Sequence, residues 1–111
     1  MSASQVDTLL TREQKTYNFD FSVKALIQAG QTLDNNVAPT IDVFVDEGPG
    51  PKAALAYGSV AFDVPNNIVQ VQDVTPSVLA VGSTYIIKVT ATTDLGVPIS
   101  MAGAVKVQQY I

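Results

Sequence analysis

The fold is decided by residues 81–107, which read VGSTYIIKVTATTDLGVPISMAGAVKV. From Thr84 to Thr92, apolar and polar residues alternate with one exception, which is the period expected of a strand with one buried face. The turn Asp94-Leu95-Gly96 then leads into a second apolar run that ends at Val107. Gly96 supplies the positive φ that a short hairpin loop needs. The stretch therefore predicts two antiparallel strands, the first of which turns Tyr85, Ile87, Val89 and Ala91 toward a core.

A second alternating run, from Thr16 to Ser22, carries three aromatic side chains on one face. Further along, the run from Tyr57 to Val64 places Phe62 on an apolar face. Short extended runs separated by Gly, Pro and Asn recur about every 8 to 12 residues, which is typical of a β-sandwich or barrel. We therefore predict an all-β sandwich of about six or seven antiparallel strands. Its predicted core residues are Tyr17, Phe19, Phe21, Phe62, Tyr85, Ile87 and Val89.

Composition limits the classes of function. The 111 residues suffice for one domain, and the net charge is −4 with six scattered Lys and Arg residues. Because nucleic-acid affinity depends on clustered basic residues, we expect no direct binding to DNA or RNA. We also expect no membrane insertion, since no apolar run is long enough, and no signal peptide at Met1. Only 14% of residues are charged, which indicates either a surface that meets other proteins or simply one rich in Thr, Ser, Asn and Gln.

The two ends of the chain are the predicted partner contacts. Residues 1–15 read as an N-terminal arm before a sandwich domain at 16–111, because Val6, Leu9 and Leu10 stand alone among polar residues. Such an arm is either a frayed terminus, with a short helix conceivable across residues 7–14, or a segment that orders against a partner. The arm hypothesis expects removal of residues 1–14 to weaken assembly without unfolding the sandwich. Tyr110 and Ile111 end the chain with two apolar side chains, which either contact a partner or close the core.

The inventory of reactive side chains argues against an enzyme. The chain has no His and no Cys, so the usual base near neutral pH and the thiolate nucleophile are both missing. Asp46 and Glu47 are adjacent and, in an extended chain, would point to opposite faces, so we predict no catalytic carboxylate pair. The oxygen-rich stretches 34–36 and 46–48 lack the spacing of a calcium loop. We predict no catalytic, cofactor-binding or metal-binding residues.

Tyr85 has a structural interpretation. Gly82-x-x-Tyr85, followed by Ile87, stands where an immunoglobulin domain has its tyrosine corner and its second cysteine. We therefore expect the phenol hydroxyl to bond to nearby backbone.

A series of short motifs follows one order along the chain: Tyr17-x-Phe19-Asp20-Phe21-Ser22, Leu26, Gly30-Gln31-Thr32-Leu33, Gly82-x-x-Tyr85, Val89-x-Ala91-Thr92-Thr93-x-x-Gly96 and Val105-x-Val107. This order resembles a known family. The short immunoglobulin-like virion proteins of tailed bacteriophages, in particular the fiber-tail adaptors of short-tailed phages, are similar over residues 15–109. The resemblance implies an immunoglobulin-like sandwich and a non-enzymatic structural protein, made in the bacterial host cytoplasm. In the virion it would sit in multiple copies between tail tube proteins and fiber.

Two departures and two alternatives accompany this resemblance. Only Gly82 precedes the Tyr85 segment, where the family usually has two glycines, and the loop Gly48-Pro49-Gly50-Pro51 looks like an insertion. A capsid decoration or cement protein would use the same fold to join capsid subunits. A carbohydrate-binding module would need a row of exposed aromatic side chains or a calcium site, and the sequence indicates neither.

Overall fold

The structure is a computed structural model that describes residues 6–22, 27, 30–63 and 66–109. These residues form eight strands and two short 3-10 helices, η2 (Lys52–Ala54) and η4 (Val78–Ala80). The strands are β1 (Val6–Leu10), β2 (Lys15–Asp20), β3 (Thr40–Glu47), β4 (Leu55–Ala56), β5 (Ser59–Asp63), β6 (Ile68–Pro76), β7 (Thr84–Thr92) and β8 (Pro98–Gln108).

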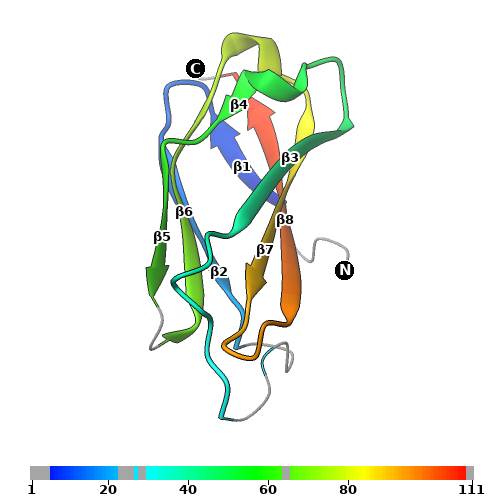
Figure 1. The fold of residues 1–111 in the computed structure, drawn as a ribbon. Helices are drawn as coiled ribbons and strands as arrows, with labels where there is room; N and C mark the ends of the chain where they lie inside the picture. Colours follow the sequence, from blue (N-terminus) through cyan, green and yellow to red (C-terminus); the bar gives the residue numbers. More distant parts are fainter. Residues whose placement is uncertain (1–5, 23–26, 28–29, 64–65, 110–111) are drawn as a thin grey trace.

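The strands form two sheets that face each other as a sandwich (Figure 1). Sheet A has the order β1-β8-β7-β3, and in sheet B the strands β2, β4 and β5 all pair with β6. The series β8-β7-β3 and β2-β6-β5 match the G-F-C and B-E-D orders of immunoglobulin domains. The prediction of an all-β sandwich is therefore confirmed. Its dimensions of 46 × 23 × 19 Å make it an elongated body.

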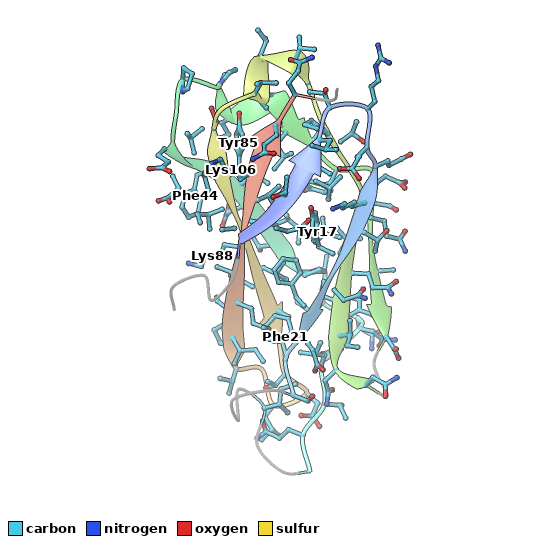
Figure 2. The ribbon with its side chains drawn as sticks, turned by 180° about the vertical axis from the view of Figure 1, so that it is seen from behind. Tyr17, Phe21, Phe44, Tyr85, Lys88 and Lys106 are labelled. Atoms are coloured by element: carbon cyan, nitrogen blue, oxygen red, sulfur yellow. The ribbon has the colours of Figure 1, made fainter. Side chains whose placement is uncertain are left out.

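The core lies between the sheets and contains the side chains that alternation predicted. Tyr85, Ile87, Val89 and Ala91 of β7 are buried, and so are Phe19 and Phe21, which extend the aromatic face of β2. Tyr17 and Phe62 are partly buried and pack against this cluster. Figure 2 shows Tyr17 and Phe21 in the space between the sheets, while Phe44 and Lys88 project from the outer side of sheet A.

The hairpin between β7 and β8 is confirmed as well. Gly96 has a φ of 80°, and its N–H donates to the carbonyl of Thr93 at 2.9 Å. The N–H of Thr93 in turn donates to the carbonyl of Val97 at 2.9 Å. Only a residue free of Cβ strain holds that φ without cost, so the glycine fixes the register of the two longest strands of the domain.

The N-terminal arm is the main error of the sequence interpretation. Residues 6–10 form β1, which pairs in parallel with Ala104–Gln108 of β8. Leu9 has no exposed surface and belongs to the core. The local pattern hid the strand because one of its inward positions, opposite Val105, is taken by the carboxylate of Asp7. The boundary at residue 15 is therefore wrong, and one strand pair of the sandwich is parallel.

Two smaller corrections concern strand number and strand length. The described residues contain eight strands rather than six or seven, since both β1 and the two-residue β4 add to the expected set. Asp46 and Glu47, which immediately precede the Gly48-Pro49-Gly50-Pro51 loop, are the last residues of β3. A register shift between Val45 and Glu47 lets the strand continue to the glycine at position 48.

Candidate functional site

The predicted partner contacts are only partly placed by the structure. Leu9 packs within the domain's own core, and Leu10, its neighbour, is half-buried on the opposite face of β1. Val6 joins β1 through its backbone pairing with Ala104, while Tyr110 and Ile111 lie outside the described residues. A partner surface at the start of the chain therefore cannot use Leu9 unless β1 leaves the sheet.

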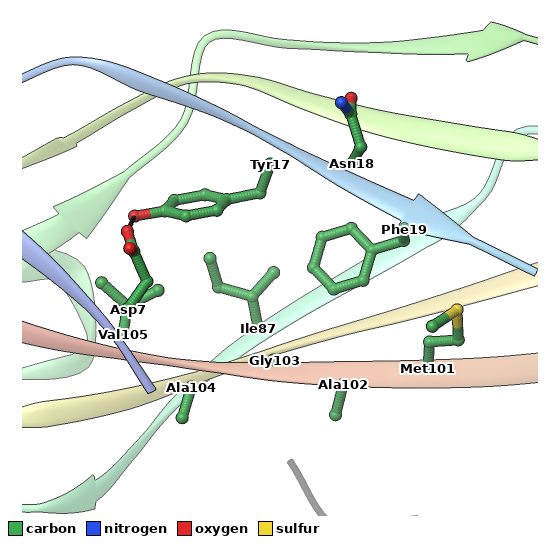
Figure 3. A pocket seen from close by; sticks show the side chains of 10 residues that line it. All are labelled: Asp7, Tyr17, Asn18, Phe19, Ile87, Met101, Ala102, Gly103, Ala104 and Val105. Atoms are coloured by element: carbon green, nitrogen blue, oxygen red, sulfur yellow. Dashed lines mark hydrogen bonds between the residues drawn. The ribbon is translucent and has the colours of Figure 1, made fainter. Parts of the chain in front are cut away.

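A hydrogen-bonded cluster ties β1 to the opposite sheet. The hydroxyl of Tyr17 donates to Oδ2 of Asp7 at 2.6 Å, and Nζ of Lys15 lies 3.2 Å from the same oxygen (Figure 3). Lys15 also donates to the carbonyl of Thr8 at 2.9 Å. Because Asp7 belongs to sheet A and Tyr17 to sheet B, the cluster closes this side of the sandwich near the start of the chain.

The surroundings shift the pKa of both members of the pair in opposite directions. Partial burial alone would raise the pKa of Asp7, but the hydrogen bonds from Tyr17 and Lys15 and the charge of Lys15 hold it below its usual value. Burial, followed by the hydrogen bond to the Asp7 carboxylate, raises the pKa of Tyr17 well above its usual value. Neither group exchanges a proton near neutral pH, so the pair supports structure rather than acid–base catalysis.

The cluster lies at the mouth of a small cavity of about 280 Å³. Figure 3 shows the ring of Tyr17 reaching across to Asp7, with Phe19 and Ile87 beside it and Asn18 turned away. Apart from Asp7, Tyr17 and Asn18 the lining residues are apolar, so the cavity offers packing space without reactive chemistry. The complete lining is Asp7, Tyr17, Asn18, Phe19, Ile87, Met101, Ala102, Gly103, Ala104 and Val105.

Tyr85 anchors the loop between β3 and η2. Its hydroxyl donates to the carbonyl of Pro51 at 2.9 Å, so the predicted bond to backbone is present, but its acceptor is 34 residues away in the sequence and not in the nearby segment that a tyrosine corner uses. The N–H of Gly50 donates to Oγ of Ser83 at 2.7 Å, and a Cβ on Gly48 would lie 2.6 Å from Cα of Ser83. Burial raises the pKa of Tyr85, with a smaller opposing effect of its hydrogen bond with Ser83. The glycines therefore let the loop lie directly against the start of β7.

The two ends of the sandwich expose apolar side chains that the sequence interpretation did not single out. Val78 and Leu79, in η4, are 71% and 66% exposed, and Leu95, in the β7–β8 hairpin, is 69% exposed. Strand β7 runs from η4 to the hairpin and so separates Leu79 from Leu95 by about 30 Å, at about 3.3 Å per residue. Figure 1 shows the β6–β7 and β7–β8 connections at opposite ends. An apolar residue inside a turn, such as Leu95 between Asp94 and Gly96, was the available signal.

A groove lies between β3 and the segment formed by η2 and β4, apart from the cavity beside Asp7 and Tyr17. Its volume is about 460 Å³. The walls are apolar except for Lys52. The lining residues are Ile41, Val43, Lys52, Ala53, Leu55, Ala56 and Tyr57.

Comparison with protein-family models, with curated protein sequences and with solved structures finds no match to this chain. Across the described ranges, no three ligand side chains of the His, Cys, Asp or Glu type come together in a way that could hold a metal ion. No helix in the described part of the chain is long and apolar enough to span a bilayer.

Proposed function

We propose that this chain is a non-enzymatic structural protein of a bacteriophage virion, and that it bridges a tail fiber to the tail in multiple copies. The resemblance of its motif order to fiber-tail adaptors motivates the proposal. The observation that carries it is the exposure of aliphatic side chains at both ends of an elongated sandwich. Exposed apolar groups of this kind are typical of protein contacts, and a bridge needs two of them, facing apart.

The rest of the structure is compatible with an assembly role. The side-chain clusters at Asp7–Tyr17 and Ser83–Tyr85 hold backbone segments in place, and their titrating groups are shifted away from neutral pH. A two-sheet sandwich resists deformation along its strands, because every internal strand is hydrogen-bonded on both sides. A rigid spacer with an apolar group at each end suits a position between two larger proteins.

Quantitative mass spectrometry of purified virions tests the proposal. A copy number of about one or two per portal subunit is the expected result for a tail adaptor, because the tail attaches at the single portal ring. Copies comparable to the major capsid protein would replace the proposal with a capsid decoration or cement protein. Absence from the particles would refute a virion role.

Substitutions at the two ends test the bridge itself. Leu79→Asp and Leu95→Asp each place a charge in an apolar contact, so each variant should be folded by circular dichroism yet depleted from particles at least about tenfold. Thr16→Asp, at an exposed position of β2, is the matched control and should be incorporated normally. Normal incorporation of both leucine variants would show that the ends do not form the bridge.

A further inference from the structure

The free edge of β3 is a second kind of surface, distinct from the two ends. β3 pairs with β7 along one side, and no strand of the described residues pairs with its other side. It has eight residues, a length of about 26 Å at about 3.3 Å per residue. Along an open edge of this kind, alternate residues direct unpaired N–H and C=O groups outward, ready to accept another strand.

The groove beside this edge makes the surface specific. Val43 and Leu55 form its floor at 8% and 5% exposure, and Tyr57, 40% exposed, stands at its rim. A strand added to β3 would continue sheet A, so every second side chain would point inward, over this groove. The groove volume of about 460 Å³ and its apolar walls suit aliphatic side chains at those positions.

The outer face of β3 determines which side chains suit the outward-facing positions of an added strand. Asp42, Phe44 and Glu47 are exposed there, and Asp46 adds a third exposed carboxylate to β3. The strand itself contains no Lys or Arg. The outward side chains of an added strand would lie beside these groups, where Lys or Arg gains from the carboxylates and from the ring of Phe44.

The same charges disfavour a second copy of this chain as the occupant. Pairing β3 with the β3 of another copy would bring three carboxylates from each molecule along one edge, and only Lys88 of β7, opposite Asp42, lies beside them. Like charges on neighbouring strands destabilise a sheet. The acidic edge therefore opposes self-association and favours a basic partner.

From these observations we propose that the β3 edge and its groove bind an extended segment of another protein, in which apolar and basic residues alternate, as an added strand of sheet A. This assignment deepens the proposed function, because a neighbouring virion protein would supply the segment. The geometry of the site does not depend on which protein that is.

Binding of a synthetic peptide to the full chain tests the assignment. The probe is a nine-residue peptide that alternates valine and lysine, compared with one that alternates valine and glutamate. In amide NMR titrations, the lysine peptide should shift resonances of β3, η2 and β4, whereas the glutamate peptide should cause no such shifts. Shifts scattered over the acidic surface, or confined to β2 and β8, would overturn the proposal.

Matched variants separate the groove from general charge attraction. Ala56→Trp fills the groove and should weaken binding at least about tenfold, while Ala38→Trp, at an exposed loop position outside the groove, should not. Asp42→Lys should weaken binding about twofold to fivefold, and Asp94→Lys, which changes the net charge equally, should leave it unchanged. Equal losses for the two lysine variants would show that only net charge attracts the peptide.

Two further measurements distinguish this proposal from self-association at the same edge and from the proposed virion function. Sedimentation analysis should find the free protein monomeric, and a dimer dissociated by Ala56→Trp would assign the edge to a second copy instead. A protein that binds the lysine peptide at β3 but is absent from virions would retain the strand site and lose the proposed function. A protein that is present in virions but does not bind the lysine peptide would retain the proposed function and lose the strand site.

Discussion

Replacement of Leu9 by Ala tests whether β1 is part of the folded domain. Leu9 has no exposed surface and lies in the core cluster, so its truncation removes buried apolar area and leaves a cavity. Buried Leu→Ala changes cost about 2 to 5 kcal/mol in the free energy of unfolding. Since β1 is an edge strand that can shift inward, we expect about 2 to 3 kcal/mol. For a domain of this size, that lowers Tm by about 10 to 20 °C.

The neighbouring leucine provides the control. Leu10 is only partly buried and faces the outer side of sheet A, so Leu10→Ala should cost about 1 kcal/mol or less. Urea unfolding followed by far-ultraviolet circular dichroism measures both variants, because the chain has no Trp to report by fluorescence. The midpoint should fall much further for Leu9→Ala, with the slope unchanged.

The result that would refute this reasoning is equality of the two variants. If Leu9→Ala cost no more than Leu10→Ala, β1 would be dispensable to the fold and the arm interpretation would stand. The same structure changes the expectation for deletion of residues 1–14. That deletion removes β1 and uncovers the inner side of Val107, so it should destabilise the sandwich rather than leave it intact.

Two further predictions concern hydrogen bonds and glycines. Tyr17→Phe removes the bond to Asp7 and should cost about 1 to 2 kcal/mol at neutral pH, measured by urea unfolding. The folded pKa of Asp7 lies below its usual value of 3.8, so its contribution to stability is present above pH 3.8 and is lost as the pH falls through the lowered folded pKa. Tyr17→Phe should flatten this acid dependence of the free energy of unfolding, and an unchanged dependence would contradict the assignment. Gly48→Ala combines a φ of 105° with a Cβ 2.6 Å from Cα of Ser83, while Gly96→Ala combines a φ of 80° with open space. Thermal unfolding should show Gly48→Ala as the more damaging by at least about 1 kcal/mol, and equal losses would mean that the loop moves away from Ser83 at little cost.

The sequence could predict those features that depend on neighbours in the chain. The alternation from Thr84 to Thr92 identifies β7 and its inward face, because successive side chains of a strand must point to opposite sides. The turn at Gly96 is predictable because glycine takes the positive φ of a short hairpin loop without strain. The burial of Phe19 and Phe21 follows from the apolar area that three aromatic residues on one face would otherwise expose to water.

Contacts between segments distant in the chain are harder to predict from the sequence than these local features. The hydroxyl of Tyr85 was expected to bond to backbone, but its acceptor, the carbonyl of Pro51, lies 34 residues away in the sequence. The exposure of Leu79 and Leu95 was not expected, since a strand pattern says which residues face inward but not which turn residues lack a cover. The groove beside β3 depends on how β4 and η2 pass that strand, which no local pattern specifies.

The sequence by itself therefore determined the class of the fold, the faces of its central strands and the core aromatic residues, because these depend on periodicity and turn chemistry alone. Only the tertiary structure decided that residues 6–10 belong to the sandwich. Their parallel partner is about 98 positions away, by the spacing of Val6 and Ala104, and the inward Asp7 breaks the apolar alternation. That carboxylate is half-buried at the edge of the sandwich, where Tyr17 and Lys15 of the opposite sheet bond to it.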